Sequence, residues 1–371
     1  MTIKFNDLHA QYLQCKDEID ASIQRIISDS SFIRGQDVEK FEDAFALATG
    51  RNYAVSCANG TDALYAAFRA LDIKLGDEVI VPSHSWISTA EAVTQAGGNV
   101  VFCEVDERTF TIDPKKIEEL ITNKTVGIVP VHLYGQACDM DRICRVANKY
   151  SLWIVEDCAQ AHLATYKSKQ VGSFGALATY SFYPGKNLGA FGDAGALTTD
   201  DPKLADYISR FCRHGGLKKG QHTMEGINSR MDTIQAAILN CKLPHLHAWT
   251  MKRQDVARTY TELFSYTADI KSPFVAPQNE HVWHLYVIKC DNRDALRSHL
   301  SSRNIPTIIN YPTCLPLLEA YSRLGHVVSD FPISTINQAT ILSLPMHPFL
   351  STSDVEYIAS TISHFTQQSC S

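Results

Sequence analysis

The stretch SFYPGKNLGAFGDAGALTT, residues 181–199, joins two apolar, strand-like segments through a glycine-rich loop. Pro184 and Gly185 end the first segment, and the loop that follows holds a single lysine, Lys186. A lysine buried at a strand end has its pKa lowered, because burial disfavours the charged amine. Its amine is then available as a nucleophile and base. The stretch therefore predicts an α/β fold with a lysine able to form a Schiff base with a carbonyl compound.

Outward from this loop, short apolar runs alternate with amphipathic helical patterns over the first two thirds of the chain. The predicted strands are residues 53–57, 78–82, 100–105, 126–132, 152–157, 177–183 and 195–199, with helices such as 61–71 and 88–97 between the earlier ones. This alternation is typical of an α/β domain with a mostly parallel, here seven-stranded, sheet flanked by helices. Helices covering both faces of such a sheet explain why its strands are nearly continuous apolar runs.

The pattern changes after about Leu243. A long helical stretch at 246–265 is followed by a strand-like run at 284–290 and by helical patterns at 293–304 and 351–365. We therefore expect a large domain over residues 1–243 and a smaller C-terminal α/β domain over residues 244–371.

Composition narrows the class of protein. The 371 residues carry a net charge of −6 with both signs interspersed, which gives no reason to expect nucleic-acid or membrane partners. The first twenty residues lack the pattern of a secretory signal, and no apolar run is long enough to span a bilayer. Eleven cysteines without a CxxC pair predict reduced thiols in a cytoplasmic protein. No metal site is expected, because the closest histidine pattern, HLH at 245–247, favours a surface or packing role.

The carboxyl ends of the strands should carry the ligand site, as in other open α/β sheets. NGTDAL, residues 59–64, follows the first strand as a turn and helix start that suits a phosphate, although a simply capped helix explains it equally well. Trp86, after the second strand, could stack on a planar cofactor or pack in the core. Asp157 ends the fifth strand and could hold a protonated ring nitrogen or cap a helix, with Gln160 and His162 in reach of the same pocket.

Together these features match one cofactor. A phosphate cradle, a stacking aromatic ring, a carboxylate for a pyridine nitrogen and a Schiff-base lysine are what pyridoxal 5′-phosphate (PLP) requires. The carboxylate keeps the ring nitrogen protonated, so that the ring accepts the electrons of a deprotonated carbon. The sequence therefore predicts PLP as the cofactor, with pyridoxamine phosphate as its intermediate form.

The chain also resembles the DegT/DnrJ/EryC/StrS family of sugar aminotransferases over nearly its whole length. The motifs that carry this resemblance are FNDLHAQY, FIRGQDVEKFE, NGTDAL, GDEVIVP, VHLYGQ, VEDCAQAH, SFYPGKNLGAFGDAG, GINSRMDTIQAAIL and ILSLPMHP. The resemblance implies the aspartate-aminotransferase-like PLP fold type I and an aminotransferase activity.

The resemblance implies a cofactor-binding set. Lys186 would be the catalytic residue that binds the cofactor covalently, Asp157 would pair with the pyridine nitrogen, and Gln160 would contact the ring hydroxyl. The other contacts would come from Gly60, Thr61 and Ser181 at the phosphate, Trp86 on the ring, and Asn228 at the phosphate of the neighbouring subunit's cofactor. A site shared in this way implies a homodimer.

Substrate contacts are implied less closely. Arg230 and His214 belong to the intersubunit region and would face the nucleotide sugar. His162, Tyr183 and Tyr311 are further candidates for substrate contacts. The family often carries a histidine five residues after the tyrosine in this part of the small domain, but here Pro316 stands in its place, so contacts from this segment stay open.

The residues after the lysine suggest a substrate. Asn187, Leu188 and Gly189 resemble the members acting on dTDP-linked 3-keto sugars, whereas 4-keto members more often carry threonines there. We therefore expect conversion of a dTDP-3-keto-6-deoxyhexose into a 3-amino-3,6-dideoxyhexose of gluco or galacto configuration. Glutamate is the expected amino donor, and O-antigen, lipopolysaccharide or other surface polysaccharide is the expected destination.

Three alternatives remain. A dTDP- or GDP-linked 4-keto-6-deoxysugar aminotransferase would share most of these motifs. A dehydratase of the same fold would carry histidine in place of the lysine, and Lys186 argues against it. A PLP-binding regulatory protein without turnover would not need the intact lysine, aspartate and phosphate cradle.

Overall fold

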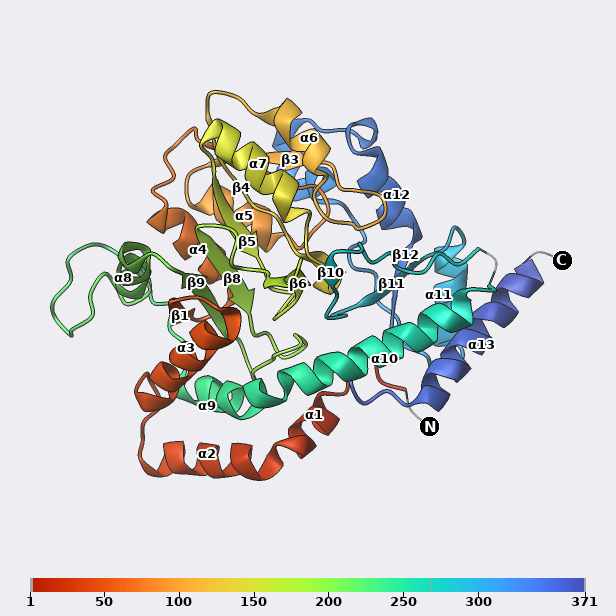
Figure 1. The fold of residues 1–371 in the computed structure, drawn as a ribbon, viewed down its shortest axis with the longest axis horizontal. Coiled ribbons are helices and arrows are strands. Elements are labelled where there is room, and N and C mark those ends of the chain that lie inside the picture. Colours follow the sequence, from red (N-terminus) through yellow and green to blue (C-terminus); the bar gives the residue numbers. More distant parts are fainter. Residues whose placement is uncertain (1–2, 268, 370–371) are drawn as a thin grey trace.

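The computed structural model describes residues 3–267 and 269–369 and is built around one large sheet (Figure 1). Its seven strands lie in the order β1-β9-β8-β5-β4-β2-β3. Only β9 runs antiparallel to its neighbours, and the other adjacent pairs are parallel. The strands are β1 (Tyr53–Cys57), β2 (Glu78–Pro82), β3 (Asn99–Cys103), β4 (Thr125–Ile128), β5 (Trp153–Asp157), β8 (Leu177–Ser181) and β9 (Gly195–Thr199). The predicted α/β fold with a mostly parallel seven-stranded sheet is confirmed.

Alternate residues of each strand enter two separate cores, which explains the continuous apolar runs. Ile80 and Ile154 face one core, while Val81 and Val155 face the other. The first core packs under α3 (Gln36–Thr49), α7 (Met140–Tyr150) and α9 (Thr233–Lys242), and the second under α4 (Gly60–Ala70), α5 (Ser88–Gln95) and α8 (Pro202–Phe211). The molecule therefore has a helix layer on each face of the sheet (Figure 1).

Three strands end earlier than the sequence predicts, and the first of them, β3, ends at Cys103 instead of residue 105. β4 ends at Ile128 instead of residue 132, because Pro130 has no N–H to donate to the ladder. β8 ends at Ser181 instead of residue 183, where the Pro184–Gly185 turn begins. Because β1, β5 and β8 run in the same direction, their carboxyl termini lie on one edge of the sheet, where the chain that leaves them can form a site.

A further apolar core lies toward the C-terminus. The antiparallel pair β11 (Tyr286–Lys289) and β12 (Ile341–Leu344) packs with α10 (Leu246–Phe264), α11 (Arg293–Ser301) and α13 (Thr352–Ser369). The long helix α10 runs from the sheet toward this core (Figure 1). The chain passes from α9 into α10 through one 3-10 turn, Leu243–His245, so the division at residue 243 stays a prediction.

The remaining elements are short or peripheral. They are α1 (Leu8–Gln14), α2 (Lys16–Ser28), α6 (Pro114–Ile117), β6 (Thr165–Tyr166), β7 (Lys169–Gln170), β10 (Asn279–Glu280) and α12 (Pro332–Thr340). Helix α2 packs on α9 and α10 through Ile19, Ile238 and Trp249. Among the described residues, no helix combines the length and the apolar character that a bilayer crossing requires.

Candidate active site

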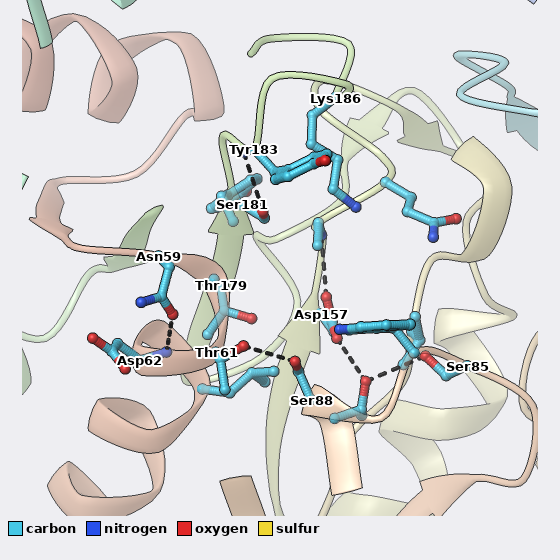
Figure 2. A pocket seen from close by; sticks show the side chains of 18 of the residues that line it. Asn59, Thr61, Asp62, Ser85, Ser88, Asp157, Thr179, Ser181, Tyr183 and Lys186 are labelled. Carbon is cyan, nitrogen blue, oxygen red and sulfur yellow. Dashed lines mark hydrogen bonds between the residues drawn. The ribbon is translucent and has the colours of Figure 1, made fainter. Parts of the chain in front are cut away.

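A cavity of about 740 Å³ opens at the carboxyl edge of the sheet, beside the ends of β5 and β8 and the first turn of α4 (Figure 2). Most of the predicted site residues line it: Gly60, Thr61, Trp86, Asp157, Gln160, Ser181, Tyr183, Lys186 and Tyr311. Residues that the sequence separates by as much as 251 positions therefore share one wall, as expected for strand ends in a parallel sheet.

Lys186 points its amine into this cavity from the loop after β8 (Figure 2). Burial lowers the pKa of Lys186 to about 8, and the negative charge of Asp157 opposes this shift only in part. An amine with that pKa is partly unprotonated near neutral pH and can act as a nucleophile or accept a proton.

Asp157 faces Lys186 from the end of β5, with its side chain buried. One carboxylate oxygen accepts a hydrogen bond from the Thr89 hydroxyl at 2.9 Å, and the other accepts one from the Ala159 amide at 3.1 Å. Burial nevertheless raises the pKa of Asp157, because two neutral donors do not replace the lost water. The carboxylate therefore lacks a close cation, which a protonated ring nitrogen would supply. No helix starts here, so Asp157 is not a helix cap.

Glu156, the residue before Asp157, serves the opposite face of the sheet. Its carboxylate accepts hydrogen bonds from the backbone amides of residues 172, 174 and 175, and it lies 3.0 Å from His132 Nε2. His132 Nδ1 accepts from the Cys138 amide, so Nε2 carries the proton and donates it to Glu156. Cys158 lies close to both groups, but these bonds already occupy the imidazole and the carboxylate. Glu156 therefore anchors a loop and takes no part in the cavity.

The first turn of α4 is the expected phosphate cradle. Asn59 caps this helix by accepting a hydrogen bond from the Asp62 amide at 2.8 Å, and the turn it fixes lines the cavity. Gly60 packs so closely against β8 that an added Cβ would lie 2.7 Å from the Ser181 Cβ. The Thr61 hydroxyl contacts Ser88 at 2.7 Å. The capped helix is therefore present, and its first turn lines the cavity where a phosphate could bind, so that the two alternatives left by the sequence do not exclude each other.

Aromatic side chains form the outer wall. The Trp86 ring is 57% exposed and lies 5.6 Å from the Tyr311 ring. Gln160 donates to the Tyr311 hydroxyl at 2.9 Å and accepts from the Tyr134 amide at 2.7 Å. Tyr183 is also largely exposed at the cavity. The wall thus offers a flat apolar surface, while Gln160 is held in one orientation.

His162 is not brought into the cavity. It is fully buried, its ring packs against Tyr180 and Phe182, and neither ring nitrogen has a hydrogen-bond partner among the described residues. This placement favours a packing role over the expected substrate contact, because Tyr180 and Phe182 lie around the ring.

Asn228, Arg230 and His214 also lie outside this chain's cavity wall. Asn228 pairs with Arg213 in an isolated bridge, and its side chain is exposed, as is that of His214. Ser229, between Asn228 and Arg230, is buried, and its hydroxyl donates to the Asp62 carboxylate at 2.7 Å. The segment is therefore fixed to the phosphate cradle while Asn228 itself faces outward.

Two residues on which the expected substrate depends, Asn187 and Pro316, lie outside the cavity wall. Asn187 is buried and donates to the Val282 carbonyl at 2.9 Å, while its oxygen lies 3.1 Å from His284 Nδ1. It thus ties the lysine loop to the segment that leads into β11. Pro316 is buried in a 3-10 turn and does not line the cavity.

Several cavity residues were missed from the sequence. Thr89 and Ser88 stand in the first turn of α5, and Ser85 supports Thr89 at 3.2 Å. The hydroxyl-rich run SHSWIST after β2 was the available signal, but only its tryptophan was singled out. Asp193, an exposed carboxylate in the glycine-rich loop, also lines the cavity.

These groups fit PLP. A buried carboxylate without a close cation, an amine of lowered pKa and a capped helix start closed by a glycine occupy one cavity. The carboxylate would hold the ring nitrogen, the amine the aldehyde carbon, and the helix start the phosphate.

Residues 14–363 match the model of the DegT/DnrJ/EryC1/StrS aminotransferase family. The chain belongs to this family. It is a nucleotide-sugar aminotransferase of PLP fold type I, and its cofactor is PLP, as the sequence predicted.

Relatives are similar over almost the full length of this sugar aminotransferase. The dTDP-3-amino-3,6-dideoxy-alpha-D-galactopyranose transaminase of Aneurinibacillus thermoaerophilus is 42% identical, covering 98% of this chain and 99% of the relative. The UDP-2-acetamido-2-deoxy-3-oxo-D-glucuronate aminotransferase of Pseudomonas aeruginosa is 38% identical, covering 98% and 100%. The crystal structure of S. venezuelae DesV in complex with a ketimine intermediate superposes with a TM-score of 0.96 at 38% identity, covering 99% of both chains.

Proposed function

We propose that this enzyme transfers an amino group from glutamate to the 3-keto group of a dTDP-3-keto-6-deoxyhexose. The product would be a dTDP-3-amino-3,6-dideoxyhexose used in surface polysaccharides such as O-antigen. The observation that carries the proposal is the 42% full-length identity to a transaminase of a dTDP-3-amino-3,6-dideoxy sugar, combined with the Lys186 and Asp157 pair in one cavity.

Each group in the cavity has a defined task in this reaction. PLP, when bound, supplies an electron sink and carries the amino group between donor and acceptor. Asp157 keeps positive charge on the ring nitrogen, because a carboxylate buried with only neutral donors is stabilised by a cation. The first turn of α4 orients the phosphate, and Trp86 covers the ring face.

Lys186 moves the proton. Its amine, with a pKa of about 8, can move a proton between the two carbons that flank the transferred nitrogen, one belonging to the cofactor and the other to the substrate. The loop holds this amine across the cavity from Asp157 (Figure 2).

The nucleotide and the carbon to be aminated are proposed from the relatives' names. The two curated relatives described above are named for chemistry at carbon 3, one on a dTDP-linked and the other on a UDP-linked sugar. A UDP-linked 3-oxo sugar is therefore the second candidate substrate, supported by the Pseudomonas aeruginosa relative.

We also propose a homodimer with shared sites. Asn228 faces outward beside the phosphate cradle, where it could reach the cofactor of a second copy. Phe32 and Ile33, next to this segment, are 44% and 51% exposed. Exposed apolar side chains grouped beside a site are typical of a subunit interface. His214 and Arg230 would then contact the sugar nucleotide from the partner's side.

We propose that the reaction takes place in the cytoplasm. The ten described cysteines are free thiols and most are buried, a state that a reducing compartment maintains.

Purified enzyme supplied with glutamate and, in separate reactions, dTDP-3-keto, dTDP-4-keto and UDP-3-oxo sugars tests the proposal. NMR of the product locates the new amine. Preferred turnover of the dTDP-3-keto sugar supports the proposal. Preferred amination at carbon 4 would refute it, and preference for the UDP sugar would select the second candidate.

A further inference from the structure

Lys242, the last residue of α9, is a buried cation without a carboxylate partner. Its side chain is 1% exposed, and no ion pair to it is found among residues 3–267 and 269–369. The ammonium donates to the Gly189 carbonyl at 2.7 Å and to Gln11 Oε1 at 3.1 Å, and it lies 4.5 Å from the centre of the Phe191 ring. A buried ammonium held only by neutral groups is costly, so its position calls for an explanation.

Its partners belong to the loop that carries Lys186. Gly189 is the point where this loop folds back on itself, because an added Cβ would lie 2.3 Å from the Pro184 carbonyl oxygen. With no side chain to fix it, this turn depends on its backbone contacts. The carbonyl of Gly189 accepts from Lys242, and the next amide, of Ala190, donates to the Phe182 carbonyl at 2.8 Å.

The other end of the loop is held by the N-terminal segment. Asn6 donates to the carbonyl of Gly185, the residue before Lys186, at 3.1 Å. Helix α1 contributes Gln11 to the ammonium, and Tyr12 packs its ring edge-on against Phe191 at 5.9 Å. The loop is thus fixed on both sides of Lys186 by contacts that converge on α1 and the end of α9.

We propose that Lys242 is a positioning residue for catalysis, which fixes the Lys186 loop by binding the Gly189 carbonyl. The inference rests on the proposed role of Lys186. An ammonium forms stronger hydrogen bonds to carbonyls than a neutral donor does, and its bonds are shorter and more directional. The carbonyl groups at the C-terminus of α9 also favour a cation at this position.

The coupling follows from the cost of burial. If the loop moved away, Lys242 would lose its shortest hydrogen bond while remaining among apolar side chains. The loop and the ammonium therefore hold each other in place, and burial lowers the pKa of Lys242 to about 8 without a compensating carboxylate. Lys242 lies outside the cavity wall, so its effect on the reaction passes through the loop.

The test compares Lys242→Met with Lys252→Met, a matched change of an exposed lysine on α10. Amide hydrogen exchange across residues 183–192 is measured in the holoenzyme without substrate, and kcat and KM are measured with the keto sugar. For Lys242→Met we expect about ten-fold faster exchange in this loop and about ten-fold lower kcat, with KM within about two-fold, as for loss of a hydrogen bond from a charged donor.

Gln11→Leu keeps the experiment decisive if Lys242→Met does not fold. It removes one acceptor of the ammonium and should increase exchange in the same loop to a smaller extent. Loop exchange equal to that of Lys252→Met, or a uniform increase over the whole chain, would overturn the proposal. Hydrogen exchange measures how firmly the loop is held, whatever reaction the enzyme catalyses. The product assay tests the proposed function, so failure of that function and failure of the role of Lys242 are seen in different measurements.

Discussion

Replacing Thr89 by valine removes one of the two hydrogen bonds to the Asp157 carboxylate while keeping the shape of the side chain. The Thr89 hydroxyl lies 2.9 Å from Asp157 Oδ2, and both groups are buried. A hydrogen bond to a charged acceptor contributes about 1.5–3 kcal/mol. The pKa of Asp157, already raised by burial, should rise further, because the lost donor favours the carboxylate. The ring nitrogen would then lose part of its counter-charge.

The expected result is a fall in kcat/KM of about 10- to 100-fold, which is the same free energy expressed as a rate. Affinity for PLP should fall as well, measured by titration of the apoprotein with the cofactor's visible absorbance. Thr94→Val is the control, because Thr94 is on the same helix and its hydroxyl donates only to the Glu91 carbonyl. If Thr89→Val matches this control in both measurements, the Asp157 carboxylate does not depend on Thr89 and the reasoning fails.

Three further predictions concern the cavity. Burial lowers the pKa of Lys186 from 10.5 to about 8, because the folded state disfavours the protonated amine. The protonated amine therefore destabilises the folded protein. This loss of stability is absent above about pH 10.5 and complete below about pH 8. Lys186→Met should therefore raise the free energy of unfolding of the apoprotein by about 2 kcal/mol near pH 6.5 and by little near pH 10. Urea unfolding at both pH values measures this, and an equal change in stability at the two pH values would contradict it. Gly60→Ala should lower PLP affinity about ten-fold or more, because its Cβ would lie 2.7 Å from the Ser181 Cβ. Cofactor titration of the variant beside the native enzyme checks this, and equal affinities would contradict it. If the sites are shared in a dimer, Lys186→Ala and Asn228→Ala are each inactive alone, but mixing them should restore up to about one quarter of the native activity. About half of the dimers are then mixed, and each mixed dimer has one intact site. Recovery of no activity would argue against sharing.

The fold could be predicted because its strands are buried on both faces. All seven predicted strands form the sheet, since continuous apolar runs such as residues 78–82 have few alternatives to a covered parallel strand. The strand ends were less certain, because local chemistry decides them. Pro130 removes a ladder donor and ends β4 four residues before the predicted boundary.

The site was predictable where function places a residue directly after a strand. Asp157 and Gly60 satisfy this condition, whereas Lys186 lies in the glycine-rich loop after β8, and all three line the cavity. Thr89 was missed because it lies in the first turn of α5, well beyond the end of β2, where a threonine has many possible roles. His162 was misplaced for a related reason: five residues after Asp157 the chain has already turned back into the core. Residues proposed to act across a subunit interface, such as Asn228, cannot be placed from one chain's strand order.

The sequence signal for the substrate has a different physical meaning in the structure. Asn187 and Gly189 follow the lysine and suggest a 3-keto sugar, yet neither lines the cavity. Asn187 binds the segment before β11, and Gly189 binds Lys242. These residues therefore determine how the lysine loop is supported. A sugar carbon is selected by where the amine of Lys186 lies relative to the bound nucleotide, so a differently supported loop can favour a different carbon without contacting the sugar. We therefore expect Asn187→Ala to lower turnover with both dTDP-keto sugars and to reduce the preference for carbon 3, measured as the ratio of the two kcat/KM values. An unchanged ratio would assign the preference to the residues that do face the cavity, such as Tyr183 and Trp86.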